Sequence, residues 1–204
     1  MTRRFSMIRS FHVADLFTLA NAACGTGAIF LAMAYVSEGG PSKIYSAGIV
    51  LLFAVIFDLL DGRVARWRHS ASPLGRELDS LADALSFGVA PACLARAVGF
   101  TGAWDTAVLL FFVACGISRL ARYNVTAEEL SDDSGKVAYY EGTPITASLG
   151  LVLLIVVLVA IGRVGDELPG GVWTVAGGEL HPLVLLYVLS GALMISKTVR
   201  IPKP

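Results

Sequence analysis

Charged residues are scarce in this chain of 204 residues. They make up 16% of it, whereas about a quarter of the residues in an ordinary soluble domain are charged. The 16 Lys and Arg residues balance the 16 Asp and Glu residues, which leaves no net charge of either sign. This balance excludes the basic surface of a nucleic-acid-binding protein and the composition of an acidic disordered tail. We therefore expect no nucleic acid among the partners of this protein.

Cysteine is also rare. Cys24, Cys93 and Cys115 are odd in number, lie in apolar surroundings, and show neither a CxxC motif nor a Cys/His spacing. The pattern gives no sign of a disulfide framework or of a metal site built on cysteine, so we interpret all three as packing residues. The three histidines occur singly along the chain and are interpreted as interfacial or capping residues.

Apolar residues, in contrast, make up 55% of the chain. They gather in six windows separated by segments rich in Gly, Pro or charge, and a span of the bilayer takes about 20 residues. We therefore predict an all-α polytopic integral membrane protein with six transmembrane helices, folded as a single domain over residues 1–204. The windows cover residues 13–36, 44–60, 78–98, 104–120, 144–161 and 182–195.

The distribution of positive charge predicts the orientation. With the N-terminus inside, only three of the 16 basic residues fall on the outer side, and these are Lys43, Arg96 and Arg163. By the positive-inside rule, both termini and the polar ends of the second and third spans are expected in the cytoplasm. The composition favours a plasma or inner membrane, and an organellar membrane remains the alternative. The arginines and apolar residues that precede Val13 predict a short helix in the plane of the membrane interface.

Four aspartates lie where the second span ends and the third begins. Asp58 and Asp61 are three residues apart, and Asp79 and Asp83 are four apart, so each pair projects from one face of its helix. Charge within a span costs about 2.5–3.5 kcal/mol per residue and marks functional sites. Carboxylates in a low dielectric need a counter-charge, and oxygen ligands favour Mg²⁺, Mn²⁺ or Ca²⁺. The cluster predicts metal-assisted phosphoryl chemistry at the cytoplasmic membrane face.

Other residues of the same segment suit a phosphate. Gly62 and Gly75 would let a phosphate or nucleotide approach the backbone closely, and Arg66 could hold a phosphate. Two other interpretations remain. The aspartates could form a buried ion network with Arg63, Arg66 or Arg68, or they could line the pathway of a non-enzymatic cation transporter.

The spacing D-x2-D-G-x2-A-R-x8-G-x3-D-x3-D, which runs from Asp58 to Asp83, resembles the signature of the CDP-alcohol phosphatidyltransferase family. The resemblance implies that family's six-helix fold, a homodimer, two divalent ions (Mg²⁺ or Mn²⁺), and transfer of a phosphatidyl or similar group from a CDP-linked lipid to an alcohol, with release of CMP. It also implies the roles of individual residues. Metal binding would fall to Asp58, Asp61, Asp79 and Asp83, general base catalysis to Asp83, and the CDP-lipid site to Gly62, Ala65, Arg66 and Gly75.

Asn21 is a polar residue inside the first span. Members of the family carry a similar Thr/Asn segment close to the nucleotide, so the resemblance favours contact between Asn21 and the CDP-lipid. The alternative is a hydrogen bond between helices.

Three later segments, at residues 86–91, 118–124 and 140–144, resemble the branch of the family that uses L-serine as acceptor and CDP-diacylglycerol as donor. Serine needs a cation for its carboxylate and an anion for its ammonium group. Arg119 and Arg122 suit the carboxylate, Asn124 could add a hydrogen bond, and Glu141 could meet the ammonium group. The arginines could instead be topology anchors. Glycerol 3-phosphate or inositol phosphate as acceptor, and an archaeal-type ether-lipid donor, remain alternatives.

Overall fold

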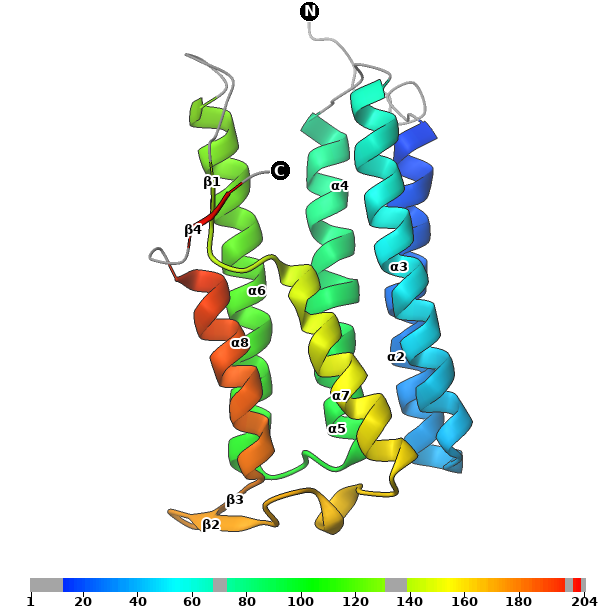
Figure 1. Cartoon of the computed structure of the whole chain (residues 1–204), viewed down its shortest axis with the longest axis vertical. Helices are drawn as coiled ribbons and strands as arrows, with labels where there is room; N and C mark the ends of the chain where they lie inside the picture. The colour runs from blue at the N-terminus through cyan, green and yellow to red at the C-terminus, as the bar shows by residue number, and fades with distance from the viewer. Residues whose placement is uncertain (1–12, 68–72, 131–138, 197–199, 203–204) are drawn as a thin grey trace, which may run out of the picture.

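The computed structural model describes residues 13–67, 73–130, 139–196 and 200–202. The predicted interfacial helix before Val13 lies outside the described residues. Helices dominate the described part of the chain (Figure 1). They are α2 (Val13–Glu38), α3 (Pro41–Trp67), α4 (Pro73–Asp83), α5 (Ala90–Val98), α6 (Ala103–Leu130), α7 (Leu149–Ala160) and α8 (Leu185–Ile195).

Four stretches of helix are long and apolar enough to cross a membrane: Ala14–Glu38, Pro41–Val64, Leu74–Val98 and Ala103–Val125. They correspond to the first four predicted windows, which makes this an integral membrane protein. The last two windows form shorter apolar helices, Ile145–Ala160 and Pro182–Ile195. Each begins with a 3-10 turn, η2 (Ile145–Ser148) before α7 and η4 (Pro182–Val184) before α8.

The third stretch is continuous because a π-helical segment, η1 (Ala84–Val89), joins α4 to α5. A π-helical turn is rare and is frequently found at functional sites. The segment begins directly after Asp83, and its residues Ser86, Phe87 and Gly88 are buried. The irregular turn therefore lies next to one of the predicted site residues.

Short strands complete the described structure. β1 (Tyr139–Glu141) pairs antiparallel with β4 (Arg200–Pro202), with Tyr140 opposite Ile201. β2 (Trp173–Val175) pairs antiparallel with β3 (Gly178–Leu180), and a 3-10 turn, η3 (Gly165–Glu167), precedes this hairpin. In Figure 1 the β2–β3 hairpin lies at the end of the bundle where α2 turns into α3.

Small residues bring α2 close to its neighbours. α2 and α3 form an antiparallel pair joined by Gly39 and Gly40, whose φ angles of 71° and 91° suit glycine. Gly25 of α2 lies against η1, where an added Cβ would stand 2.4 Å from Oγ of Ser86. Close packing through small residues is typical of membrane helices. It holds α2 directly against the π-helical segment that follows Asp83.

Larger side chains fill the centre of the bundle. Phe112 of α6 and Tyr187 of α8 are buried and meet edge to face, with ring centroids 5.2 Å apart. The hydroxyl of Tyr187 donates a hydrogen bond to the carbonyl of Pro91 (3.3 Å), as a buried tyrosine hydroxyl requires. These contacts fix α8 against α5 and α6. Many large apolar side chains face outward, such as Phe30 and Leu52, as expected of a surface in contact with lipid.

Candidate metal centre

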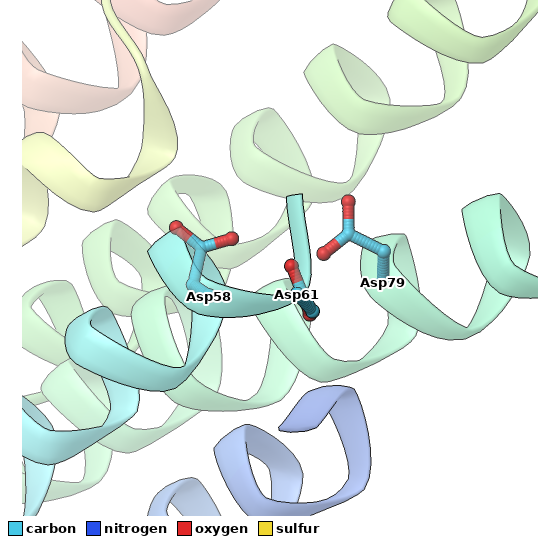
Figure 2. Close-up of side chains that lie close together, drawn as sticks. All are labelled: Asp58, Asp61 and Asp79. Carbon is cyan, nitrogen blue, oxygen red and sulfur yellow. The ribbon is translucent and has the colours of Figure 1, made fainter. Parts of the chain in front are cut away.

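Three carboxylates meet between α3 and α4. Asp58 and Asp61 come from α3, and Asp79 comes from α4 (Figure 2). One oxygen from each of the three lies within 4.8 Å of the others. The i,i+3 spacing puts Asp58 and Asp61 on one face of α3, and the packing of α4 brings Asp79 to the same space. The sequence prediction that these residues come together is confirmed for this trio.

Asp83 lies one turn beyond Asp79, at the end of α4. It is 9% exposed and lies close enough to Asp58, Asp61 and Asp79 to interact with them electrostatically. The amide nitrogen of Asn21 donates a hydrogen bond of 3.2 Å to Oδ1 of Asp83. The fourth carboxylate is therefore held beside the trio by a contact from α2.

Helix α2 supports the centre at a second point. The hydroxyl of Thr18 donates a hydrogen bond of 2.7 Å to Oδ2 of Asp61, and both residues are buried. Thr18 is not among the site residues predicted from the sequence. Its position in the sequence could have indicated the role, because Thr18 lies three residues before Asn21 and residues three apart share a helix face. Asn21 makes the interhelical bond that was the alternative to nucleotide contact, and its carbonyl accepts a hydrogen bond of 2.9 Å from Ser86.

The trio has the properties of a site for a hard divalent cation. All of its ligand atoms are carboxylate oxygens, which Mg²⁺ and Mn²⁺ prefer. Oδ1 of Asp79 is buried without a hydrogen-bond partner among the described residues, and a buried polar atom in that state is costly unless something binds it. Asp61 is buried and the other two are half-buried, and carboxylates this close repel one another unless a positive charge lies between them. The residues therefore fit a metal ion.

The glycine of the motif on α3 borders open space. A Cβ added to Gly62 would meet no atom within 4 Å among the described residues, so packing within the protein does not require glycine here. Gly75 lies in the first turn of α4. Ala65 and Arg66 lie in the last turns of α3, but the structure does not describe their side chains. Arg68 lies outside the described residues.

The residues proposed for serine lie on a neighbouring part of the bundle. Asn124 of α6 donates a hydrogen bond of 3.0 Å to the hydroxyl of Ser80, the residue that follows Asp79 on α4. Its amide also lies 3.5 Å from Oε1 of Glu77, so Asn124 contacts α4 through Ser80 and Glu77. Arg119 is half-buried on the same helix. Glu141 belongs to β1, and its side chain lies outside the described residues.

Arg122 binds the end of α8. Its Nη1 donates to the carbonyl of Ile195 (3.1 Å) and its Nη2 to that of Met194 (3.5 Å). The last carbonyls of a helix lack partners within the helix and favour a positive charge. Thr143 adds a backbone hydrogen bond to the carbonyl of Leu193 (3.2 Å). The second and third segments that resemble the serine-using branch therefore meet at the end of α8.

Comparisons with known proteins agree with this geometry. The sequence model of the CDP-alcohol phosphatidyltransferase family matches residues 11–195. The CDP-diacylglycerol–serine O-phosphatidyltransferase of Saccharomyces cerevisiae is 44% identical over 203 residues, which cover 98% of this chain and 74% of the yeast protein. The Bacillus subtilis protein of the same name is 32% identical over 76% of this chain and 83% of its own length. The archaetidylserine synthase of Methanothermobacter thermautotrophicus is 41% identical over 54% of this chain and 46% of its own length.

Proposed function

Because the chain belongs to the CDP-alcohol phosphatidyltransferase family, we propose that it transfers the phosphatidyl group of CDP-diacylglycerol to the hydroxyl of L-serine. The products are phosphatidylserine and CMP, and the reaction belongs to phospholipid biosynthesis. The observation that carries the proposal is the meeting of Asp58, Asp61 and Asp79 beside Asp83. The names of the yeast and bacterial relatives support serine as the acceptor.

Two divalent ions, Mg²⁺ or Mn²⁺, are the proposed cofactor. Asp58, Asp61, Asp79 and Asp83 would hold them, and the buried, unpartnered Oδ1 of Asp79 supports this assignment. When bound, such ions offset the charge of the donor's diphosphate and of the departing CMP. The protein's part is to fix four oxygen ligands on two rigid helices and to keep bulk water away from them.

Asp83 is the proposed general base. Its carboxylate takes the proton from the hydroxyl of serine, and the serine oxygen forms a bond to the lipid-side phosphorus. The bond between that phosphorus and the oxygen of CMP breaks, and CMP leaves. The amide of Asn21, bonded to Oδ1 of Asp83, would hold the carboxylate so that its other oxygen faces serine.

The CDP-lipid would bind along Gly62, Ala65, Arg66 and Gly75, with Asn21 on the side of α2. The open space beside Gly62 supports this assignment, since a glycine that packing does not require leaves the backbone accessible to a ligand. The lipid tails would reach the site from the membrane between helices.

Serine would bind between the carboxylates and α6. The bond of Asn124 to Ser80, which joins α6 to the helix that carries Asp79, supports a place for Asn124 between the two helices. Arg119 and Arg122 would face the carboxylate of serine, and Glu141 would face its ammonium group. Arg122 would combine this role with its bonds to α8.

The proposed setting is a plasma or inner membrane, with six spans, an interfacial N-terminal helix, and both termini and the active site at the cytoplasmic face. The two shorter apolar helices would complete the six spans. A homodimer is the proposed assembly, as the family resemblance implies.

The test is release of CMP by the purified protein in detergent, with CDP-diacylglycerol and Mg²⁺ or Mn²⁺. Serine, glycerol 3-phosphate, inositol and inositol phosphate serve as parallel acceptors. Release with serine alone is the expected result. Release with another acceptor would keep the family's chemistry and overturn serine as substrate. Metal flux through liposomes without any CMP release would favour the transporter.

A second donor is supported by one observation, the similarity to an archaetidylserine synthase. An ether-lipid analogue of CDP-diacylglycerol in the same assay tests it. Turnover with the ether lipid and none with the diacyl lipid would replace the proposed donor while leaving the carboxylate site and serine unchanged.

A further inference from the structure

The β2–β3 hairpin forms a shelf at the end of the bundle. It follows α7 and precedes α8, and in Figure 1 it extends sideways past the ends of α6 and α8. A two-residue turn at Ala176 and Gly177 closes it, with φ angles of 46° and 80°. Positive φ at both central residues is typical of a tight hairpin turn whose twist matches the right-handed twist of its two strands.

Several contacts fix the hairpin to the start of α6. The indole nitrogen of Trp104 donates a hydrogen bond to the carbonyl of Val175 (2.8 Å). The Trp104 ring covers Gly178, where an added Cβ would stand 2.9 Å from the indole. Gly102 packs against the backbone of Glu179, whose carbonyl oxygen would stand 2.3 Å from a Cβ on that glycine. The hairpin therefore sits at a fixed height relative to a membrane-spanning helix.

A buried carboxylate reinforces this attachment. Asp105, in the first turn of α6, is fully buried. One of its oxygens accepts a hydrogen bond from the backbone of Gly102 (3.0 Å), and the other accepts one from the backbone of His181 (2.8 Å). The ring of His181 adds a contact of 2.6 Å to the same carboxylate. The residue that follows the hairpin is thus tied to the start of α6 by the side chain of Asp105.

The two faces of the hairpin differ in chemistry. Trp173 lies opposite Leu180, and Val175 lies opposite Gly178, and residues opposite each other in a strand pair project from the same face. This face is apolar. It is also the face that Trp104 covers, and the partly buried Leu180 packs against the core, so it is directed toward the bundle. Thr174 and Glu179 form the other face, which is polar.

The outer part of the apolar face is uncovered by the protein. Trp173 is 55% exposed and Val175 is 44% exposed, although both project from the face that is directed toward the bundle. This exposed part of the face adjoins the start of α6. Val175 contacts Trp104, and Trp104 belongs to the span Ala103–Val125. Tryptophan rings collect at the headgroup level at the ends of membrane spans.

We propose that this shelf docks on the membrane interface at the end of the bundle away from the carboxylates. Trp173, Val175 and Trp104 enter the boundary between headgroups and acyl chains, and Thr174 and Glu179 face water. The partner is the lipid surface itself. The hairpin thereby fixes the depth of α6 and α8 in the bilayer.

The test uses the three tryptophans of the chain as depth probes in lipid nanodiscs. One protein keeps Trp173 alone (Trp67→Phe, Trp104→Phe). A second keeps Trp104 alone (Trp67→Phe, Trp173→Phe) and so retains the bond to Val175. A matched control replaces all three tryptophans by phenylalanine and adds Thr174→Trp on the polar face. Each is measured with lipids brominated high or low in the acyl chain and with aqueous acrylamide, and CMP release checks that each is folded.

Interfacial rings meet the upper acyl chain, so we expect lipids brominated there to lower Trp173 emission about twofold relative to unbrominated lipids. Lipids brominated near the chain end should have a smaller effect, and the Thr174→Trp control should respond mainly to acrylamide. Trp104 should behave as Trp173 does. Quenching of Trp173 by acrylamide alone would overturn the proposal, as would protection of Trp173 from both quenchers, which would assign the face to a second copy of the chain.

Discussion

The hydroxyl of Thr18 donates a hydrogen bond of 2.7 Å to Oδ2 of Asp61, between two residues 43 positions apart in the chain. Both side chains are buried, so neither can exchange this contact for one with bulk water. The bond fixes one oxygen of Asp61, and the same carboxylate contributes an oxygen that lies within 4.8 Å of oxygens of Asp58 and Asp79. A hydroxyl on α2 thus orients a carboxylate on α3, in the way that outer contacts commonly orient metal ligands.

Thr18→Val removes this hydroxyl and nearly preserves the shape of the side chain. A hydrogen bond to a charged group contributes about 1.5–3 kcal/mol, so we expect turnover at limiting metal to fall roughly tenfold. The concentration of Mg²⁺ or Mn²⁺ that gives half-maximal CMP release should rise. Thr18→Ser should restore most of the activity. Thr26→Val is the matched control, because the hydroxyl of Thr26 bonds to the carbonyl of Ala22 in its own helix (2.9 Å) and to no other helix among the described residues. Equal effects of the two valine variants would refute a specific role for Thr18.

Gly62→Ala and Gly25→Ala separate a ligand-binding glycine from a packing glycine. A Cβ on Gly62 meets no described atom within 4 Å, whereas one on Gly25 would stand 2.4 Å from Oγ of Ser86. We expect Gly62→Ala to keep its thermal stability and to raise the donor KM roughly tenfold or more, because small displacements of a bound substrate are costly. Gly25→Ala should instead lose about 1–3 kcal/mol of stability through overpacking. Thermal melts and CMP-release kinetics measure both. An unchanged donor KM in Gly62→Ala would remove Gly62 from the donor site.

Asp83→Asn replaces the proposed base by a side chain that still accepts the hydrogen bond from Asn21. We expect CMP release to fall by about 10²–10⁴-fold, the usual contribution of a general base, while CDP-diacylglycerol binding largely remains. Asp79→Asn is the comparison, because Asp79 belongs to the trio of carboxylates and has no proposed role as a base, so its loss should weaken donor binding more than loss of Asp83 does. Binding of the donor is measured directly, for example by equilibrium dialysis of a short-chain analogue. Normal turnover of Asp83→Asn would exclude Asp83 as the base.

Arg122→Ala tests two roles of one side chain. Loss of the bonds to the carbonyls of Ile195 and Met194 should cost about 1 kcal/mol, which lowers Tm by about 2–4 °C for a chain of this size. If Arg122 also faces the carboxylate of serine, the serine KM should rise more than the donor KM. Arg122→Lys should recover part of the Tm and less of the serine KM, because lysine cannot form the paired bonds of a guanidinium group. An equal rise in both KM values would leave only the role at α8.

The first four apolar windows could be predicted from the sequence because a bilayer span needs a long apolar run, and such runs are visible residue by residue. The trio of carboxylates could be predicted for a similar reason. The spacing of Asp58 and Asp61 fixes their common face on α3. The short segment between α3 and α4 restricts the positions that Asp79 can occupy relative to them. The family signature added the expected roles of these residues.

Other contacts carry no local signal. Thr18 resembles many other polar residues inside spans, and its value depends on which turn of α3 lies against α2. The partner of Arg122 is more than 70 positions away along the chain, and the shelf at Trp173 depends on a contact with Trp104 over a similar separation. Helical periodicity states which residues share a face. It does not state which face meets which neighbour.

The sequence by itself therefore determined a membrane protein with a carboxylate cluster that suits a divalent metal, because burial of apolar residues and helical spacing are local properties of the chain. Only the tertiary structure decided which hydroxyl and amide hold those carboxylates, that Arg122 binds the end of α8, and that the β2–β3 hairpin overhangs the bundle with its apolar face turned inward. Those relationships depend on the packing of side chains between distant elements, where a shift of one helical turn would change every partner.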